Sequence, residues 1–227
     1  MGLPVLIIGK SGSGKSASLR NCVDNDNFSV INVIDKPFPF RGHVKSASTD
    51  DYQKVMRWLS GAKTQSIVID DAGYLITNMF MRGHANAGTG NGVFAFYNKI
   101  GDHFWNLIEH IKNSVPKDKI VYVIMHEDTD DFGNIKPKTI GKLLDEKVSI
   151  EGMFTIVIRC IVENGKHYFV TQSSGNDVAK TPMGMFDELL IDNDIVAVDA
   201  AIREYYGMND KTDSQIESKG DSKDETV

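Results

Sequence analysis

A glycine-rich segment near the amino terminus constrains the fold more than any other part of the sequence. Residues 9–16 read Gly-Lys-Ser-Gly-Ser-Gly-Lys-Ser and match the pattern G-x-x-x-x-G-K-S. They follow the apolar run 3–8, which is typical of a strand buried on both faces. A helix is expected directly afterwards, over residues 16–23. A strand, a glycine-rich turn and a helix in this order predict a phosphate-binding loop.

Each residue type in this loop has a physical role in phosphate binding. Glycines let the backbone curl so that its N–H groups point at a phosphate, and the helix amino terminus adds its positive dipole end. Lys15 would reach the β and γ phosphates, and the Ser16 hydroxyl would bind Mg²⁺. We therefore predict ATP and Mg²⁺ as cofactors, the alternative being a turn that binds nothing. The expected nucleotide-binding residues are Gly9, Lys10, Ser11, Gly12, Ser13, Gly14, Lys15, Ser16 and Ala17.

Two acidic residues follow a second buried strand. Residues 66–69 run directly into Asp70 and Asp71. Asp70 has the position of a Walker B acid and is predicted to hold Mg²⁺ together with Ser16. Because side chains alternate along a strand, Asp71 should point away from Asp70, where it could polarise the attacking water. A purely structural role for Asp71 is the alternative.

Strand and helix patterns alternate along the rest of the chain. Tyr52, Val55, Met56 and Leu59 share one face of a helix that Thr49 would cap, and Asn193 would cap the last helix. The polar segments 78–92 and 127–138 are expected to be loops, and residues 164–165 (Asn-Gly) predict a hairpin turn. This order predicts an α/β three-layer domain with a mainly parallel sheet and a C-terminal β-hairpin. The expected strands are 3–8, 28–34, 66–69, 119–125, 154–162 and 167–171, and the expected helices include 16–23, 93–113 and 193–207.

The distribution of charge separates the end of the chain from the rest. Residues 208–227 contain three Lys and six Asp or Glu, so residues 1–207 have a net charge of −3 against −6 for all 227 residues. A polar, acidic segment with few aliphatic residues is typical of disorder. We predict one folded domain over 1–207 and a disordered acidic tail over 208–227.

Composition excludes several classes of protein. A net charge of −6 argues against a freestanding tight nucleic-acid binder, which needs clustered Lys and Arg. Cys22 and Cys160 are far apart and suggest neither a disulfide framework nor a zinc site. No apolar run approaches the roughly 20 residues of a membrane span, and no leader pattern is seen. We expect no membrane partner and a cytoplasmic location.

The motifs together resemble the RecA-core ATPases, and in particular the small phage RecA-like ATPases of the Sak four type, which are assigned to single-strand annealing recombination. The resemblance covers about residues 3–206 and implies a RecA-like P-loop NTPase core in the host-cell cytoplasm. The segments that carry it are 9–16, 67–71, His126 at the end of the fourth strand, 141–145 before the hairpin, 179–186 and 192–194.

The resemblance also implies further catalytic positions. RecA-like proteins place a carboxylate after the strand that follows the P-loop helix, which is Asp35 here, so Asp35 and Asp71 compete to orient the water. A polar residue that ends the fourth strand senses the γ-phosphate, as His126 would. Lys180 matches the lysine of a K-x-R finger that acts on the neighbouring subunit, although Pro182 stands where the arginine is expected.

The function implied is that of an Mg²⁺-dependent ATPase which acts on single-stranded DNA in annealing or strand exchange. Segments 78–92 and 127–138 lie where the RecA family has DNA-binding loops. The alternative is that both segments are flexible surface insertions that do not bind DNA. Weak DNA binding by one subunit implies a homo-oligomer, ring or filament, and a single-strand binding protein as partner. The alternatives are a nucleotide-gated adaptor resembling a helicase loader and a small-substrate P-loop kinase, although no lid-like pair of arginines is present.

Overall fold

The fold is built on one central sheet. The structure is a computed structural model that describes residues 1–140 and 149–208. Within these ranges nine strands pair in the order β3-β2-β4-β5-β1-β7-β8-β9, and β6 pairs with β5. The strands are β1 (Leu3–Gly9), β2 (Phe28–Asn32), β3 (Ser46–Ser48), β4 (Ser66–Asp70), β5 (Ile120–Thr129), β6 (Ile135–Pro137), β7 (Ile156–Glu163), β8 (Lys166–Val170) and β9 (Leu190–Asp192).

Most of the sheet is parallel, as predicted. Every neighbouring pair from β3 to β7 runs in the same direction. Strand β8 is antiparallel to its neighbours β7 and β9, and β6 is antiparallel to β5. Gly9 of β1 pairs with His126 of β5, and Asn32 of β2 pairs with Asp70 of β4. The carboxyl ends of the four strands that carry the predicted motifs therefore meet at one edge.

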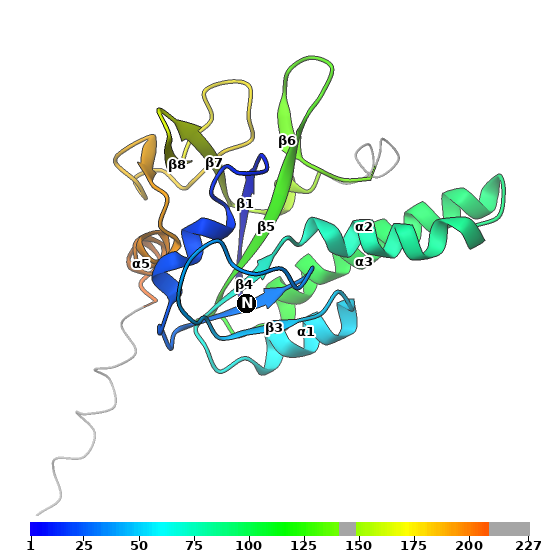
Figure 1. Ribbon diagram of the computed structural model, residues 1–227, viewed down its shortest axis with the longest axis horizontal. Helices are drawn as coiled ribbons and strands as arrows, with labels where there is room; N and C mark the ends of the chain where they lie inside the picture. The colour runs from blue at the N-terminus through cyan, green and yellow to red at the C-terminus, as the bar shows by residue number, and fades with distance from the viewer. Residues whose placement is uncertain (141–148, 209–227) are drawn as a thin grey trace, which may run out of the picture.

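Helices cover both faces of the sheet and confirm the three-layer prediction (Figure 1). The helices α1 (Tyr52–Gly61), α2 (Gly73–Gly83) and α3 (Asn91–Ser114) pack on one face, where Val55, Leu75 and Phe104 are buried. The 3₁₀ helix η1 (Ser16–Cys22) and α5 (Ile195–Tyr205) pack on the other face through Leu19 and Val198. The elements η2 (His84–Asn86) and η3 (Glu151–Met153) are short 3₁₀ helices. None of the helices within the described ranges has the length and apolar character that crossing a membrane requires.

Segment 78–92 is mostly helical, so the prediction of a loop there is wrong. Helix α2 continues to Gly83, and α3 begins at Asn91. The two helices run side by side away from the sheet as a long pair (Figure 1). The Phe80 ring packs on Phe96 and Tyr97, with ring centroids 6.4 and 5.7 Å apart. The glycine content of this segment indicated a loop, but contacts between the two helices stabilise it as helix.

The second predicted loop, 127–138, is also mostly ordered. Strand β5 continues to Thr129, and β6 returns beside it as an antiparallel hairpin. The Asp130 carboxylate accepts hydrogen bonds from the backbone N–H groups of Phe132 and Asn134 at 2.9 and 2.8 Å. The Asp130 side chain thus stabilises the turn. The polar residues of this segment belong to a projecting hairpin and not to an irregular loop.

Several expected details are corrected at the ends of elements. The side chain of Asp51, and not that of Thr49, caps α1 by accepting from the Lys54 N–H at 3.0 Å. Asp194, and not Asn193, caps α5 by accepting from the Val196 N–H at 2.9 Å. The hairpin turn is confirmed between β7 and β8, where φ is +51° at Asn164 and +77° at Gly165. Two predicted features, the motif at 141–145 and the acidic tail from residue 209 onward, lie outside the described residues.

Candidate functional site

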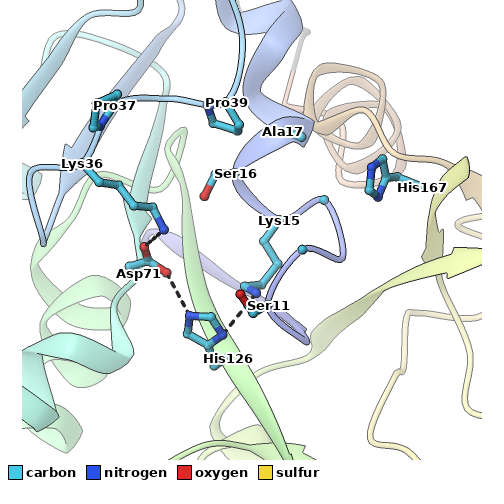
Figure 2. A pocket seen from close by; sticks show the side chains of 12 residues that line it. Ser11, Lys15, Ser16, Ala17, Lys36, Pro37, Pro39, Asp71, His126 and His167 are labelled. Carbon is cyan, nitrogen blue, oxygen red and sulfur yellow. Dashed lines mark hydrogen bonds and ion pairs between the residues drawn. The ribbon is translucent and has the colours of Figure 1, made fainter. Parts of the chain in front are cut away.

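A pocket of about 460 Å³ lies at the carboxyl edge of the sheet, beside the glycine-rich segment. Figure 2 shows the glycine-rich loop and the loop after β2 on opposite sides of this pocket. The side chains of Asp71 and His126 lie between the two loops. The lining residues are Ser11, Gly12, Gly14, Lys15, Ser16, Ala17, Lys36, Pro37, Pro39, Asp71, His126 and His167. The strand order therefore brings together residues as far apart in the sequence as Ser11 and His167.

The backbone of the glycine-rich loop needs glycine at specific positions. Gly12 and Gly14 have φ values of +78° and +104°, which side chains rarely adopt. At Gly9 the constraint is space, because an added Cβ would lie 2.4 Å from Ser13 Oγ and 2.8 Å from the carbonyl oxygen of Cys160. The loop is thus fitted closely against β7 while its other side remains open to the pocket.

Lys15 is held inside this loop. Its side chain is 5% exposed, and its Nζ donates hydrogen bonds to the carbonyl oxygens of Gly9 and Lys10, each at 2.8 Å. Nζ also lies 3.4 Å from His126 Nδ1. Burial lowers the pKa of Lys15, partly offset by the nearby acidic groups. A phosphate placed in the pocket would add the anionic partner that favours the charged form of this lysine.

Ser16 and Asp70 form a set of oxygen ligands that fits Mg²⁺. Ser16 Oγ donates to Asp70 Oδ1 at 3.0 Å. Asp70 Oδ2 is buried and has no hydrogen-bond partner among the described residues. Hydroxyl and carboxylate oxygens are the ligands Mg²⁺ prefers, and it usually keeps several waters and phosphate oxygens besides. Among residues 1–140 and 149–208, no group of three or more His, Cys, Asp or Glu could hold a metal ion.

Burial and the neighbouring carboxylate of Asp71 raise the pKa of Asp70 to about 6. A carboxyl group with this environment gains most from a divalent cation, because the cation compensates the charge that burial penalises. The electrostatics of Asp70 therefore agree with its ligand geometry.

Asp71 faces the pocket because the chain turns at this residue. Its φ is +58°, so β4 ends at Asp70 and the Asp71 carboxylate does not simply point to the opposite face of the strand. The carboxylate forms an ion pair with Lys36 Nζ, and His126 Nε2 lies 3.5 Å from Asp71 Oδ1. Although burial opposes it, contact with His126 and Lys36 lowers the pKa of Asp71 overall. Asp71 is thus an ionised carboxylate that lines the pocket.

His126 connects Lys15 with Asp71, as the dashed lines in Figure 2 show. A protonated Lys15 can only donate, so the adjacent His126 Nδ1 acts as the acceptor. In a neutral imidazole the proton then resides on Nε2, the nitrogen that faces Asp71. His126 therefore contacts both the lysine of the P-loop and Asp71.

Two predicted catalytic residues are not brought to the pocket. Asp35 lies beyond the end of β2, is exposed, and has a φ of +55°. Its carboxylate accepts a hydrogen bond from Ser48 Oγ on β3, and Asp35 does not line the pocket. The backbone of Lys180 pairs with Val157, each N–H donating to the other's carbonyl at 2.8 Å, and its side chain does not line the pocket. Within this chain, Asp71 and not Asp35 lines the pocket.

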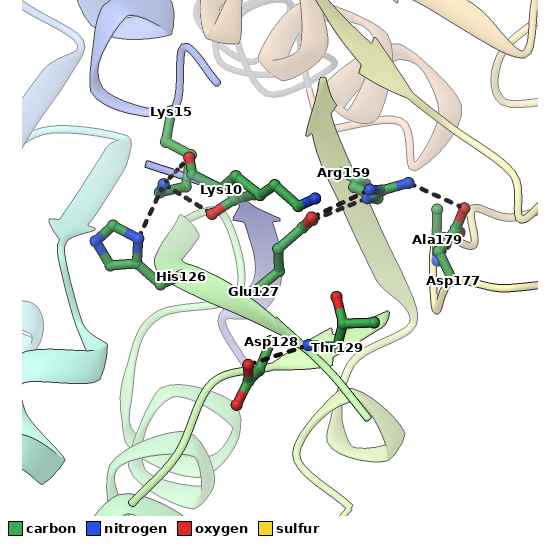
Figure 3. Close-up of polar contacts among 10 residues, drawn as sticks. Lys10, Lys15, His126, Glu127, Asp128, Thr129, Arg159, Asp177 and Ala179 are labelled. Carbon is green, nitrogen blue, oxygen red and sulfur yellow. Dashed lines mark hydrogen bonds and ion pairs between the residues drawn. The ribbon is translucent and has the colours of Figure 1, made fainter. Parts of the chain in front are cut away.

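Three groups near the pocket were not singled out from the sequence. Lys36 and His167 line it, and His167 Nδ1 lies 2.9 Å from the Ser13 carbonyl oxygen. Figure 3 shows that Glu127, next to His126, is held by Arg159, whose Nε and Nη2 lie 2.8 and 3.1 Å from the Glu127 carboxylate oxygens. No local motif marks these residues. The only available signal was the position of Glu127 directly after His126.

A glycine-rich loop after a central strand, with a strand-end acid pair across the same edge, defines a P-loop nucleotide-binding α/β domain. Residues 1–183 match the family described as an AAA domain, and the chain belongs to this family. It is an AAA-type P-loop ATPase domain.

Other comparisons add little to this assignment. No curated protein matches the chain. Among solved structures, the pilus retraction motor PilT with bound ADP aligns with 92% of this chain at 11% identity and a TM-score of 0.34. The chain spans 53% of that structure's length. The likeness is too low to support conclusions about activity or assembly.

Proposed function

We propose that this domain hydrolyses ATP with Mg²⁺ and uses the reaction to promote annealing or strand exchange of single-stranded DNA. The observation that carries the ATPase proposal is the connected set of Lys15, His126 and Asp71 beside the Ser16–Asp70 pair. The P-loop residues Lys15 and Ser16 thus line one pocket with Asp71, and Asp70 contacts Ser16.

Each of these residues has a distinct role in the proposal. Lys15 neutralises charge on the β and γ phosphates, and the backbone N–H groups of the loop bind the same oxygens. Asp71, ionised and buried, accepts a hydrogen bond from the attacking water and orients it. His126 reports the state of the phosphate to Asp71 and fixes the position of that carboxylate. When bound by Ser16 and Asp70, Mg²⁺ would neutralise charge that develops on the phosphates.

The DNA part of the proposal is supported by the resemblance to the phage annealing ATPases and by two projections near the pocket. Strand β5 carries His126 and continues into the β5–β6 hairpin, while α2 begins just after Asp71. The α2–α3 pair carries Phe80 stacked on His84, with ring centroids 5.0 Å apart. Aromatic groups of this kind can stack on bases, but Arg82 of the same helix is paired with Asp50. One subunit should therefore bind DNA weakly, and a homo-oligomer, acting with a single-strand binding protein, would supply the affinity.

The test is ATP turnover by the full chain with and without single-stranded DNA, each with and without a single-strand binding protein. The DNA proposal expects turnover to rise several-fold with DNA, and the increase should disappear at high salt because phosphate contacts are screened. Turnover that is identical with and without DNA would contradict this part of the proposal while leaving the ATPase assignment intact.

A second candidate is a nucleotide-gated adaptor, in which binding of a protein partner is the output. The observation in its favour is a set of exposed apolar side chains on the α2–α3 pair: Met81 is 60% exposed, Phe94 51% and Trp105 46%. Slow turnover that a protein partner accelerates, and DNA does not, would favour the adaptor.

A further inference from the structure

Lys36 places a second cation in the pocket, opposite the P-loop. It follows β2, and Figure 2 shows its side chain reaching across the pocket to the Asp71 carboxylate. The Lys36 side chain is 42% exposed, whereas that of Asp71 is 1% exposed. The ammonium group therefore lies between solvent and a buried carboxylate that lines the pocket.

The backbone at Lys36 is fixed from both sides. Asn32 Nδ2 donates to the Lys36 carbonyl oxygen at 2.7 Å, and Asn32 is itself 5% exposed. One residue earlier, Asp35 has a φ of +55° and its carboxylate is held by Ser48. One residue later, Pro37 has a restricted φ. These constraints aim the lysine into the pocket and leave only its side chain free to move.

Lys36 and the P-loop line opposite sides of the same pocket (Figure 2), so a polyphosphate held by the P-loop would have Lys36 on its other side. Lys15 and Ser16 lie on the P-loop side, and Lys36 is separated from Lys15 by Asp71 and His126. Contact with Asp71 outweighs burial and raises the pKa of Lys36, so the group stays charged at neutral pH. Two cations thus face each other across a cavity of about 460 Å³.

We propose that Lys36 is a phosphate-binding cation supplied by the same subunit, which leaves Asp71 and binds the terminal phosphate of a nucleoside triphosphate. This inference rests on the proposed nucleotide site. Its first consequence is that triphosphate binding frees the Asp71 carboxylate to accept a hydrogen bond from water. Its second consequence is selectivity, because a nucleoside diphosphate has no terminal phosphate at that end and leaves Lys36 on Asp71.

The proposal differs from a trans-acting finger. Lys180 does not line the pocket of its own subunit and would have to act on a neighbour. Lys36 acts within one chain, so its effect on nucleotide affinity should be independent of protein concentration.

The experiment compares the affinities of the full chain for the β,γ-imido analogue of ATP and for ADP, both with Mg²⁺, by calorimetry. In Lys36→Ala, affinity for the triphosphate analogue should fall about tenfold or more, and affinity for ADP by less than about twofold, because one charge-assisted contact is lost. Lys36→Arg should keep most of the preference for the triphosphate. Lys45→Ala is the matched control, since Lys45 lies on the same segment between β2 and β3 but pairs with Asp26 and does not line the pocket.

Equal losses for the two nucleotides, or no loss for the analogue, would overturn the role of Lys36. If Lys36→Ala does not fold because Asp71 is left unpaired, the comparison is made between Asp71→Asn and Asp71→Asn with Lys36→Ala, and the same selective loss is expected. Failure of the proposed function has a different outcome: the wild-type chain would then bind neither nucleotide.

Discussion

Asp70 and Asp71 are adjacent in the sequence, yet their environments shift their acidity in opposite directions. Burial and the charge of Asp71 raise the pKa of Asp70 to about 6. His126 and Lys36 lower the pKa of Asp71 in spite of its burial. Two carboxyl groups with separated pKa values are suited to two roles, one as a ligand for a cation and one as a hydrogen-bond acceptor.

The raised pKa of Asp70 predicts a pH-dependent cost to the metal-free fold. Because folding raises this pKa from 3.8 to about 6, the folded protein binds a proton that the unfolded chain releases. The free energy of unfolding should therefore fall as the pH rises from 3.8 to about 6. Without Mg²⁺ or nucleotide, Asp70→Asn should be more stable than the wild type at pH 7 by up to about 3 kcal/mol, and by much less at pH 4. Urea denaturation at both pH values checks this, and a variant less stable than the wild type at pH 7 would contradict it.

The geometry also predicts which acid orients the water. At saturating ATP, Asp71→Asn should lower turnover by about 100-fold or more, because a general base or water-orienting group contributes on that order. Asp35→Asn should change turnover by less than about twofold, since its carboxylate is held by Ser48 outside the pocket. Steady-state kinetics of the two variants decide between them, and a slow Asp35→Asn beside a normal Asp71→Asn would refute this assignment.

The strands and helices predicted from the sequence were those with strong local patterns. Unbroken apolar runs predicted β1, β4 and β5. The pair Asn164 and Gly165 predicted the hairpin, and both residues have positive φ in the structure. The elements that were missed, β3, β6 and β9, have three residues each and depend on pairing with a longer strand. Helix α2 was not predicted, and its outer part is ordered by contact with α3.

The candidate site was predictable to the same degree. The P-loop has a sequence motif that requires a strand before it and a helix after it. Asp70 was predictable because it directly follows the apolar run of a second strand. The direction of Asp71 could not be predicted, because it depends on a left-handed turn at a non-glycine residue. Lys36 has no motif, and only the fold places it opposite Lys15.

The close fit of the P-loop against β7 gives a prediction about the elements. Gly9→Ala should destabilise the protein by roughly 1–3 kcal/mol, since the added methyl would overlap the backbone of Cys160 as well as the Ser13 side chain. Gly61→Ala is the matched control, because nothing lies within 4 Å of the added Cβ. Alanine at this last residue of α1 should stabilise the helix by up to about 1 kcal/mol relative to glycine. Thermal denaturation of both variants makes the comparison. A Gly9→Ala protein as stable as the wild type would show that β1 and β7 can separate at little cost.

For the whole molecule, assembly is tested by mixing subunits. If Lys180 acts on the neighbour's nucleotide, Lys180→Ala and Lys15→Ala chains should each be inactive in turnover, while a mixture regains activity at interfaces that pair an intact P-loop with an intact Lys180. The measurement is ATP turnover of the mixture as a function of total protein concentration. A mixture that stays inactive, together with a monomer at every concentration with ATP and DNA, would exclude the ring or filament.

The central claim is that the carboxyl edge of this sheet is an Mg²⁺-dependent ATP site organised around Lys15. The most direct measurement is ATP hydrolysis by the full chain, with Mg²⁺ and with a chelator, for the wild type, Lys15→Ala and the control Lys45→Ala, each checked for folding by circular dichroism. We predict Mg²⁺-dependent turnover in the wild type and in Lys45→Ala, and a loss of about 100-fold or more in a folded Lys15→Ala. Equal turnover by Lys15→Ala and the wild type, or turnover that persists without Mg²⁺, would contradict the claim.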